Sequence, residues 1–201
     1  LGSADAIVAT VKLYDLAEVA PRLLPLIGPE TAVLPLQNGV ESHSILAAAL
    51  GPAAPLKGVV SIKSYLAAPG TVICRSPFCR IRFSEADGRK SARVQRLAEA
   101  LNGCIGVSAD VPDNIDGEIW LKFIMLASFS AVSCLARATI GAVLDSDEAC
   151  TLVFEAAGEA MAVARAQGVA LPADLDDVVM RQVRDMPRDG RPSMLEDLEA
   201  G

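Results

Sequence analysis

The spacing of hydrophobic residues changes once along the chain, and the change divides the sequence into two parts. Over residues 1–110, short apolar runs typical of buried strands alternate with stretches in which apolar residues recur at helical spacing. From Asn114 onward the spacing is helical throughout. Alternating strands and helices imply right-handed crossovers and a parallel sheet. We therefore predict an α/β domain over residues 1–110, followed by an all-α domain over residues 111–201.

The bounds of the expected elements follow from the apolar runs and from the Gly and Pro residues between them. In the first half we predict strands over residues 6–11, 31–36, 57–63, 72–75, 80–83 and 104–108. Helices are predicted in that half over residues 15–26, 42–50 and 91–101. The runs 72–75 and 80–83 are interpreted as the two arms of a small antiparallel meander. In the second half we predict helices over residues 118–137, 149–167, 174–186 and 193–198.

The stretch from Glu118 to Arg137 is apolar at almost every position and contains no Pro or Gly. Such a helix is normally buried in a helical domain or in a subunit interface, and this one is too short and too closely flanked by charge to predict a membrane span. Lys122 interrupts the apolar run. A buried ammonium must find a partner, reach water or take part in chemistry. Two interpretations stay open, an ion pair with Glu118 one turn earlier and a general acid in a cleft.

Composition narrows the functional classes. The 201 residues are 52% hydrophobic and carry a net charge of −7 without a basic cluster, so we expect a folded core and no nucleic-acid partner. Five scattered cysteines and a single histidine, His43, offer no zinc spacing and no Cys/His nucleophile, so no metal site is expected. We also expect no membrane partner and a cytoplasmic location.

Three polar positions are candidates for ligand binding. Lys12 and Asn38 each follow a predicted strand directly, and ligands of open α/β sheets bind outside the carboxyl ends of the strands. The alternatives are a solvated lysine and an Asn-Gly turn that only leads into the next helix. Ser193 follows Pro192 and is expected to be a helix N-cap, a position that can also hold a carboxylate.

Six short motifs occur in one order over nearly the whole chain. They are Ile7-Val-Ala-Thr-Val-Lys12, Leu36-Gln-Asn-Gly39, Gly58-Val-Val60, Ala68-Pro-Gly-Thr-Val72, Asp116 with Ile119-Trp-x-Lys122-Phe123, and Ser193-Met-Leu-Glu-Asp197. Together they resemble the ketopantoate reductase (2-dehydropantoate 2-reductase) family. The resemblance implies a Rossmann-type domain joined to an all-helical domain. It also implies reduction of the 2-keto acid ketopantoate to pantoate with NADPH, on the route to pantothenate and coenzyme A.

The resemblance assigns roles to four residues. Lys122 matches the catalytic lysine, which as general acid protonates the carbonyl oxygen. Asn38 matches an asparagine that contacts the cofactor and helps to position the lysine, and it is also expected to bind the substrate. Lys12 matches a cofactor-contacting lysine. Ser193 matches a serine that contacts the substrate. A homodimer formed through the helical domain is the expected assembly.

The sequence departs from the family pattern in two respects. The family often has asparagines one and two turns after the lysine, where this chain has Leu126 and Ser130. No Gly-x-Gly-x-x-Gly is present, so we interpret the Rossmann-type part as lacking its first βαβ unit, and we interpret the helical part as truncated before the family's glutamate. The 201-residue chain by itself is therefore expected to be inactive. The alternatives are a reductase of another 2-keto acid and a non-catalytic dimerisation scaffold.

Overall fold

The computed structural model describes residues 2–184 and 187–201. The chain forms two compact units, Leu1–Ile119 and Trp120–Gly201, and each is described by itself. The division lies inside the long helix α4 (Ile115–Ala136). The boundary between an α/β domain and an all-α domain, predicted after residue 110, stays a prediction.

The first unit contains the predicted parallel pair. Strand β1 (Ala6–Ala9) runs parallel to β2 (Ala32–Pro35), with Ala6 opposite Ala32 and Ala9 opposite Pro35. The connection consists of helix α1 (Leu13–Val19) and the 3₁₀ helix η1 (Ala20–Leu26). The single helix predicted over residues 15–26 thus changes type at Ala20, next to Pro21, which occupies the first turn of η1.

Helices cover both faces of β2. Val33 packs with Leu16 of α1 and Leu46 of helix α2 (Ser42–Leu50). The next residue, Leu34, belongs to a second cluster with Val94 of helix α3 (Ala92–Asn102). Successive side chains of a strand point to opposite faces, so the continuous apolar run of β2 reflects burial on both sides.

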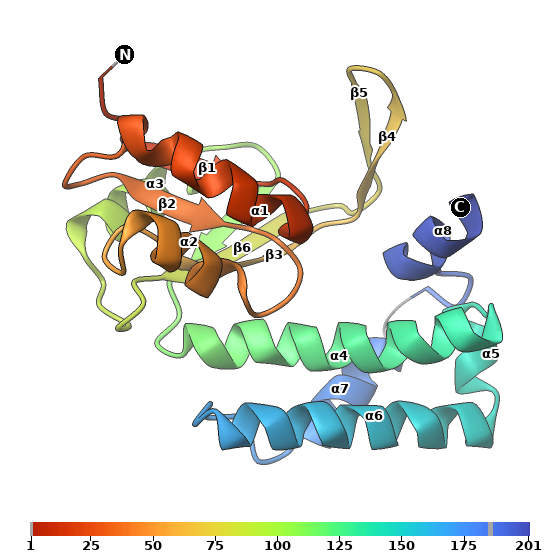
Figure 1. Ribbon diagram of the computed structural model, residues 1–201. Coiled ribbons are helices and arrows are strands. Elements are labelled where there is room, and N and C mark those ends of the chain that lie inside the picture. The colour runs from red at the N-terminus through yellow and green to blue at the C-terminus, as the bar shows by residue number, and fades with distance from the viewer. Residues whose placement is uncertain (1, 185–186) are drawn as a thin grey trace. The chain divides into compact units, whose positions relative to one another are not determined.

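The remaining strands differ from the prediction in their pairing. Strand β3 (Lys57–Ser61) pairs antiparallel with β6 (Cys79–Ser84), and β6 pairs parallel with β7 (Val107–Asp110). An unpredicted strand, β4 (Ser64–Ala68), pairs antiparallel with β5 (Thr71–Cys74). The two strands form a separate ribbon that projects from the end of β3 in Figure 1. The meander predicted from residues 72–75 and 80–83 is therefore wrong. The turn at Gly70, with φ of 78°, lets β5 pair with the residues just before it.

The second unit is helical, as predicted. After α4, the chain forms α5 (Ile140–Leu144), α6 (Asp147–Ala166), α7 (Leu175–Arg184) and α8 (Ser193–Ala200). Short polar side chains cap the beginnings of two of the helices. Asn114 accepts a hydrogen bond from the Gly117 amide at 2.9 Å, and Ser146 accepts one from the Ala149 amide at 3.2 Å. The end of the helix predicted over residues 174–186 lies outside the described residues.

Residues 187–190 accept backbone hydrogen bonds from the first residues of α5. The Gly141 amide donates to the Arg188 carbonyl at 2.7 Å, and the Arg188 guanidinium binds both carboxylate oxygens of Asp145 at 2.6 Å. A side chain at Gly141 would place its Cβ 2.8 Å from the Arg188 carbonyl oxygen. The glycine is therefore required by close backbone approach rather than by an unusual φ.

Helix α4 is less buried within this chain than its sequence predicts. Only 39% of its most apolar window is buried, and Leu135 is exposed. By length and composition alone α4 could cross a membrane, but core helices of soluble proteins pass the same test.

Candidate active site

Two of the four predicted site residues follow the parallel strands of the first unit. Lys12 is the N-cap residue of α1, three residues after β1 ends, and Asn38 comes three residues after the end of β2. Both residues are exposed. Because β1 and β2 are parallel, the two loops leave the same edge of the sheet. The carboxyl edge predicted from sequence therefore carries both residues.

Gln37 ties these two loops together. Its side-chain Nε2 donates to the carbonyl oxygens of Ala9 at 2.9 Å and Val11 at 3.0 Å. A second contact lies two residues further on, where a Cβ built on Gly39 would be 3.3 Å from Leu13 Cδ2. The two loops are thus joined by hydrogen bonds before Lys12 and Asn38 and lie close together again just after them. The sequence had indicated Gln37 only as a member of the Leu36-Gln-Asn-Gly39 motif.

Lys122 lies on α4, in the part of that helix that belongs to the second unit. Burial disfavours the charged ammonium and lowers the pKa of Lys122 to about 8, from an ordinary value of 10.5. The side chain is therefore still mostly protonated at neutral pH, but gives up its proton far more readily than a solvated lysine. A pKa near the working pH is suited to proton transfer.

Glu118, which the sequence offered as a possible partner of Lys122, forms an ion pair with Arg82. Arg82 of β6 donates to the Glu118 carboxylate at 2.5 Å, and Lys57 of β3 donates to Asp116 at 2.7 Å. These two ion pairs join the first turn of α4 to strands of the first unit. Carboxylates in a first helical turn are also favoured by the helix dipole.

The positions one and two turns after Lys122 lack carboxamides. Leu126 is half-buried and Ser130 is buried, with 5% of its surface exposed. An apolar side chain at position 126 offers no hydrogen bond to a ligand.

Ser193 is the first residue of α8 and not its N-cap, which corrects the prediction. Pro192 occupies the N-cap position in extended conformation, with ψ of 146°, and its side chain makes no capping hydrogen bond. Pro lacks a side-chain acceptor, so the first-turn amides of α8 receive no capping bond from that side chain. The Ser193 hydroxyl is exposed, whereas Leu195 is fully buried and anchors the helix.

The side chains that could bind a metal ion do not cluster in the part of the chain that the structure describes. No group of three His, Cys, Asp or Glu side chains gathers there, and all five cysteines are free. The imidazole of His43 lies 3.3 Å from the Leu56 carbonyl oxygen, and burial lowers its pKa.

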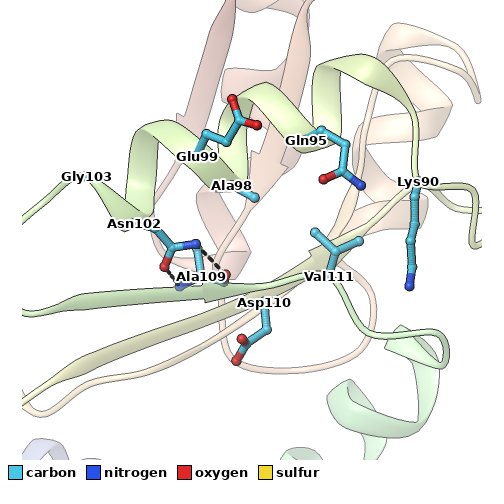
Figure 2. A pocket seen from close by; sticks show the side chains of 9 residues that line it. All are labelled: Lys90, Gln95, Ala98, Glu99, Asn102, Gly103, Ala109, Asp110 and Val111. Atoms are coloured by element: carbon cyan, nitrogen blue, oxygen red, sulfur yellow. Dashed lines mark hydrogen bonds between the residues drawn. The ribbon is translucent and has the colours of Figure 1, made fainter.

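A shallow pocket of about 650 Å³ lies elsewhere on the first unit, between α3 and β7 (Figure 2). Its lining mixes Lys90, Gln95, Glu99 and Asp110. At its floor the Asn102 carboxamide binds both the amide and the carbonyl of Ala109 at 2.8 Å. None of the four predicted site residues lines this pocket.

Two family models match the chain. Residues 1–88 match the model of ketopantoate reductase PanE/ApbA, and residues 114–201 match the model of the ketopantoate reductase PanE/ApbA C terminal. The chain belongs to the ketopantoate reductase family. The resemblance predicted from six motifs is therefore confirmed, as is the Rossmann-type α/β part followed by a helical part.

Individual proteins align over all or nearly all of the chain. An uncharacterised oxidoreductase of Bacillus subtilis, YkpB, is 27% identical over 200 residues, which are 100% of this chain and 66% of that protein. The 2-dehydropantoate 2-reductase of Archaeoglobus fulgidus is 30% identical over 198 residues, or 98% of this chain and 64% of that protein.

A solved member of the family has the same fold. The crystal structure of 2-dehydropantoate 2-reductase from Geobacter metallireducens matches with a TM-score of 0.86 and 26% identity, over 100% of this chain and 66% of that one. The chain thus spans about two thirds of the length of the relatives it matches.

Proposed function

We propose that the full-length protein reduces a 2-keto acid with NADPH, and that the keto acid is ketopantoate. The observation that carries the proposal is the half-buried Lys122, whose pKa lies near 8 and which the motif Ile119-Trp-x-Lys122-Phe123 assigns, by resemblance, as the catalytic lysine. Family membership supports the reaction class. The paired loops of Lys12 and Asn38 support a nucleotide at the carboxyl edge of the sheet.

The residues at that edge fit an anionic nucleotide. Lys12 offers an exposed ammonium for a phosphate or ribose, and Asn38 offers an exposed carboxamide that can both donate and accept. Both extend from loops fixed by the buried Gln37, so little order has to be gained on binding. NADPH, when bound, supplies the hydride.

Lys122 serves as the general acid in this proposal. Negative charge builds on the carbonyl oxygen of a ketone as it is reduced, and an ammonium beside that oxygen stabilises the charge most in a site with little water. The Lys122 ammonium then transfers its proton to the alkoxide oxygen. With a pKa near 8, the amine regains a proton from solvent at neutral pH.

Ser193 is proposed to bind the substrate carboxylate. The Ser193 hydroxyl stands at the beginning of α8, beside the amides of the first turn, and helix N-termini favour anions. Asn38 is proposed to contact the substrate as well as the cofactor.

Leu126 favours a second candidate substrate, a 2-keto acid with an apolar substituent. A half-buried leucine one turn after Lys122 would pack against such a group but cannot bind the hydroxyl of ketopantoate. The reaction and the role of Lys122 are the same in both cases.

We further propose a homodimer formed through the helical unit, in the cytoplasm. Leu152 and Val163, about three turns apart on one face of α6, expose apolar side chains that an interface would cover. The five free cysteines fit a reducing compartment.

The test uses the full-length protein and a panel of keto acids. Lys122→Ala is expected to lower kcat by about 10²-fold or more, because a general acid contributes that much to the rate. A dimerisation scaffold would turn over no keto acid with NADPH, and Lys122→Ala would change nothing. That result would reject the proposal, while the preferred keto acid decides between the two substrates.

A further inference from the structure

We propose that Gln37 is a positioning residue of the cofactor site, because its carboxamide fixes the Lys12 loop against the Asn38 loop. The inference rests on the proposed function, since it assigns Gln37 to the site that binds NADPH. Gln37 is 8% exposed, so it acts through its neighbours rather than by touching a ligand.

The contacts of Gln37 continue the sheet beyond the point where the strands end. The last backbone bond between the strands runs from the Leu36 amide to the Ala9 carbonyl at 3.1 Å. Gln37 Nε2 then binds that same carbonyl and the Val11 carbonyl, two residues further along the first loop. One side-chain amide thus supplies hydrogen bonds that backbone donors would supply in a longer strand.

The orientation of this carboxamide is determined by its partners. Both partners are carbonyl oxygens, which only accept, so the NH₂ group must face them and Oε1 must point away. Oε1 is buried and has no hydrogen-bond partner within residues 2–184 and 187–201. A carboxylate of the same shape would instead turn an oxygen toward two carbonyl oxygens and repel them.

The hydrogen bonds of Gln37 restrict the positions of both Lys12 and Asn38, because each of these residues is next in sequence to a residue that takes part in the bonds. Val11, which Gln37 binds, precedes Lys12, and Gln37 itself precedes Asn38. On the other side, Leu13 and Gly39 lie close enough that a Cβ on the glycine would approach Leu13 Cδ2 to 3.3 Å. Loss of the Gln37 bonds would therefore let Lys12 and Asn38 move relative to each other.

The experiment compares Gln37→Met and Gln37→Glu with wild type in the full-length protein. The dissociation constant of NADPH, measured by its fluorescence without substrate, is expected to rise about tenfold or more, because small displacements of positioning groups have large effects. The KM for the keto acid at saturating NADPH is expected to rise by a smaller factor, because of the two residues that Gln37 positions only Asn38 is proposed to contact the substrate. Amide hydrogen exchange in residues 11–13 and 37–39 without cofactor should accelerate.

Gln37→Glu adds a pH readout that a general loss of packing would not produce. A protonated carboxyl can donate one hydrogen bond to the carbonyls, whereas a carboxylate cannot. NADPH affinity of Gln37→Glu is therefore expected to recover toward wild type as the pH falls, while that of Gln37→Met does not. Combining Gln37→Met with Asn38→Ala should give less than the product of the single effects.

Asn102→Leu is the matched control. Asn102 also makes two carboxamide bonds to backbone groups, in the same unit but between α3 and β7. It is expected to lower Tm about as much as Gln37→Met while leaving NADPH affinity unchanged. Wild-type affinity in Gln37→Met, or equal weakening in Asn102→Leu, would overturn the role of Gln37. If wild type itself fails to bind NADPH, the proposed function falls, and the inference falls with it.

Discussion

Arg93 and Glu85 form a nearly buried ion pair at the start of α3, with Arg93 Nη2 2.6 Å from one carboxylate oxygen and Nε 2.8 Å from the other. Arg93 also donates to the carbonyls of Thr31 and Ala53, at 2.9 and 2.8 Å. One guanidinium therefore joins α3, the end of β6, the residue before β2 and the loop after α2. The contacts are all in the first unit, at the amino end of β2, which is the opposite end of that strand from the loop that carries Asn38.

Arg93→Leu is expected to destabilise the protein by about 3–5 kcal/mol at pH 7, because it leaves the Glu85 carboxylate buried and unpaired. Urea unfolding measures the change. Arg93→Leu combined with Glu85→Leu should cost less than Arg93→Leu alone. The exposed pair of Arg22 and Glu18 is the control, and its removal should cost about 0–1 kcal/mol.

The same ion pair predicts the response to acid. Burial by itself raises the pKa of Glu85, but hydrogen bonds from Arg93 and Ser91 and the charge of Arg93 outweigh it and hold the pKa below its usual value. A lowered carboxyl pKa contributes stability above the unfolded-state pKa, near 4.5, which is lost as the pH falls through the folded-state value. Unfolding followed from pH 6 downward should show a larger loss in wild type than in the double Leu variant, whose remaining loss comes from other carboxyls such as Asp87 and Asp113.

Lys122 predicts how the reaction depends on pH. A general acid must be protonated, so kcat/KM should fall about tenfold per pH unit once the pH exceeds the Lys122 pKa of about 8. Steady-state rates between pH 6 and 10, at saturating NADPH, test this. A profile that stays flat to pH 10 would remove Lys122 from the role of proton donor.

Replacing Lys122 should also stabilise the fold while it removes activity. Below pH 8 both states of the chain are protonated at Lys122, and the folded state bears the cost of a buried ammonium. Lys122→Met is therefore expected to gain about 1–3 kcal/mol at pH 7. The gain should shrink between pH 8 and 10.5, because the wild-type folded state loses its proton there before the unfolded state does. Lys90→Met, at an exposed lysine that pairs with Asp113, is the control and should show neither effect.

Leu126→Asn tests the link between position 126 and substrate choice. A carboxamide one turn after Lys122 should raise kcat/KM for ketopantoate by about tenfold, the value of one net hydrogen bond. The same change should lower kcat/KM for keto acids with apolar substituents. Leu126→Met keeps the apolar volume and should leave the ratio of the two values near that of wild type. An unchanged ratio in Leu126→Asn would show that this position does not contact the substrate.

Elements with strong local patterns could be predicted from the sequence. The run 31–36 is apolar throughout because β2 is covered on both faces, and its pattern gave the strand and the loop that follows. Asn114 and Ser146 cap helices because their short side chains reach the first free amides. The ketopantoate reductase family was visible from motifs that are each weak but occur in order.

Features set by distant contacts could not be predicted in this way. Strand β4 has no alternation because all its residues are exposed, so it gave no strand pattern. The pairing of β6 with β3 and β7 depends on residues far apart in sequence. The role of Gln37 could have been suspected only from a general rule. Backbone carbonyls just beyond the end of two paired strands need hydrogen-bond donors, and a nearby side-chain amide can supply them. For Ser193, the extended backbone of Pro192 shifted the helix start by one residue.

The carboxamide of Asn102 has a consequence for the behaviour of the protein at high concentration. Because the Gly106 carbonyl accepts from the Cys79 amide of β6, alternate residues of β7, including Ala109, direct their backbone groups away from β6. Open strand edges invite other molecules to add a strand, which is one route to aggregation. The Asn102 carboxamide already binds both the amide and the carbonyl of Ala109. These two groups are therefore not available to pair with a strand of another molecule at this edge of the sheet.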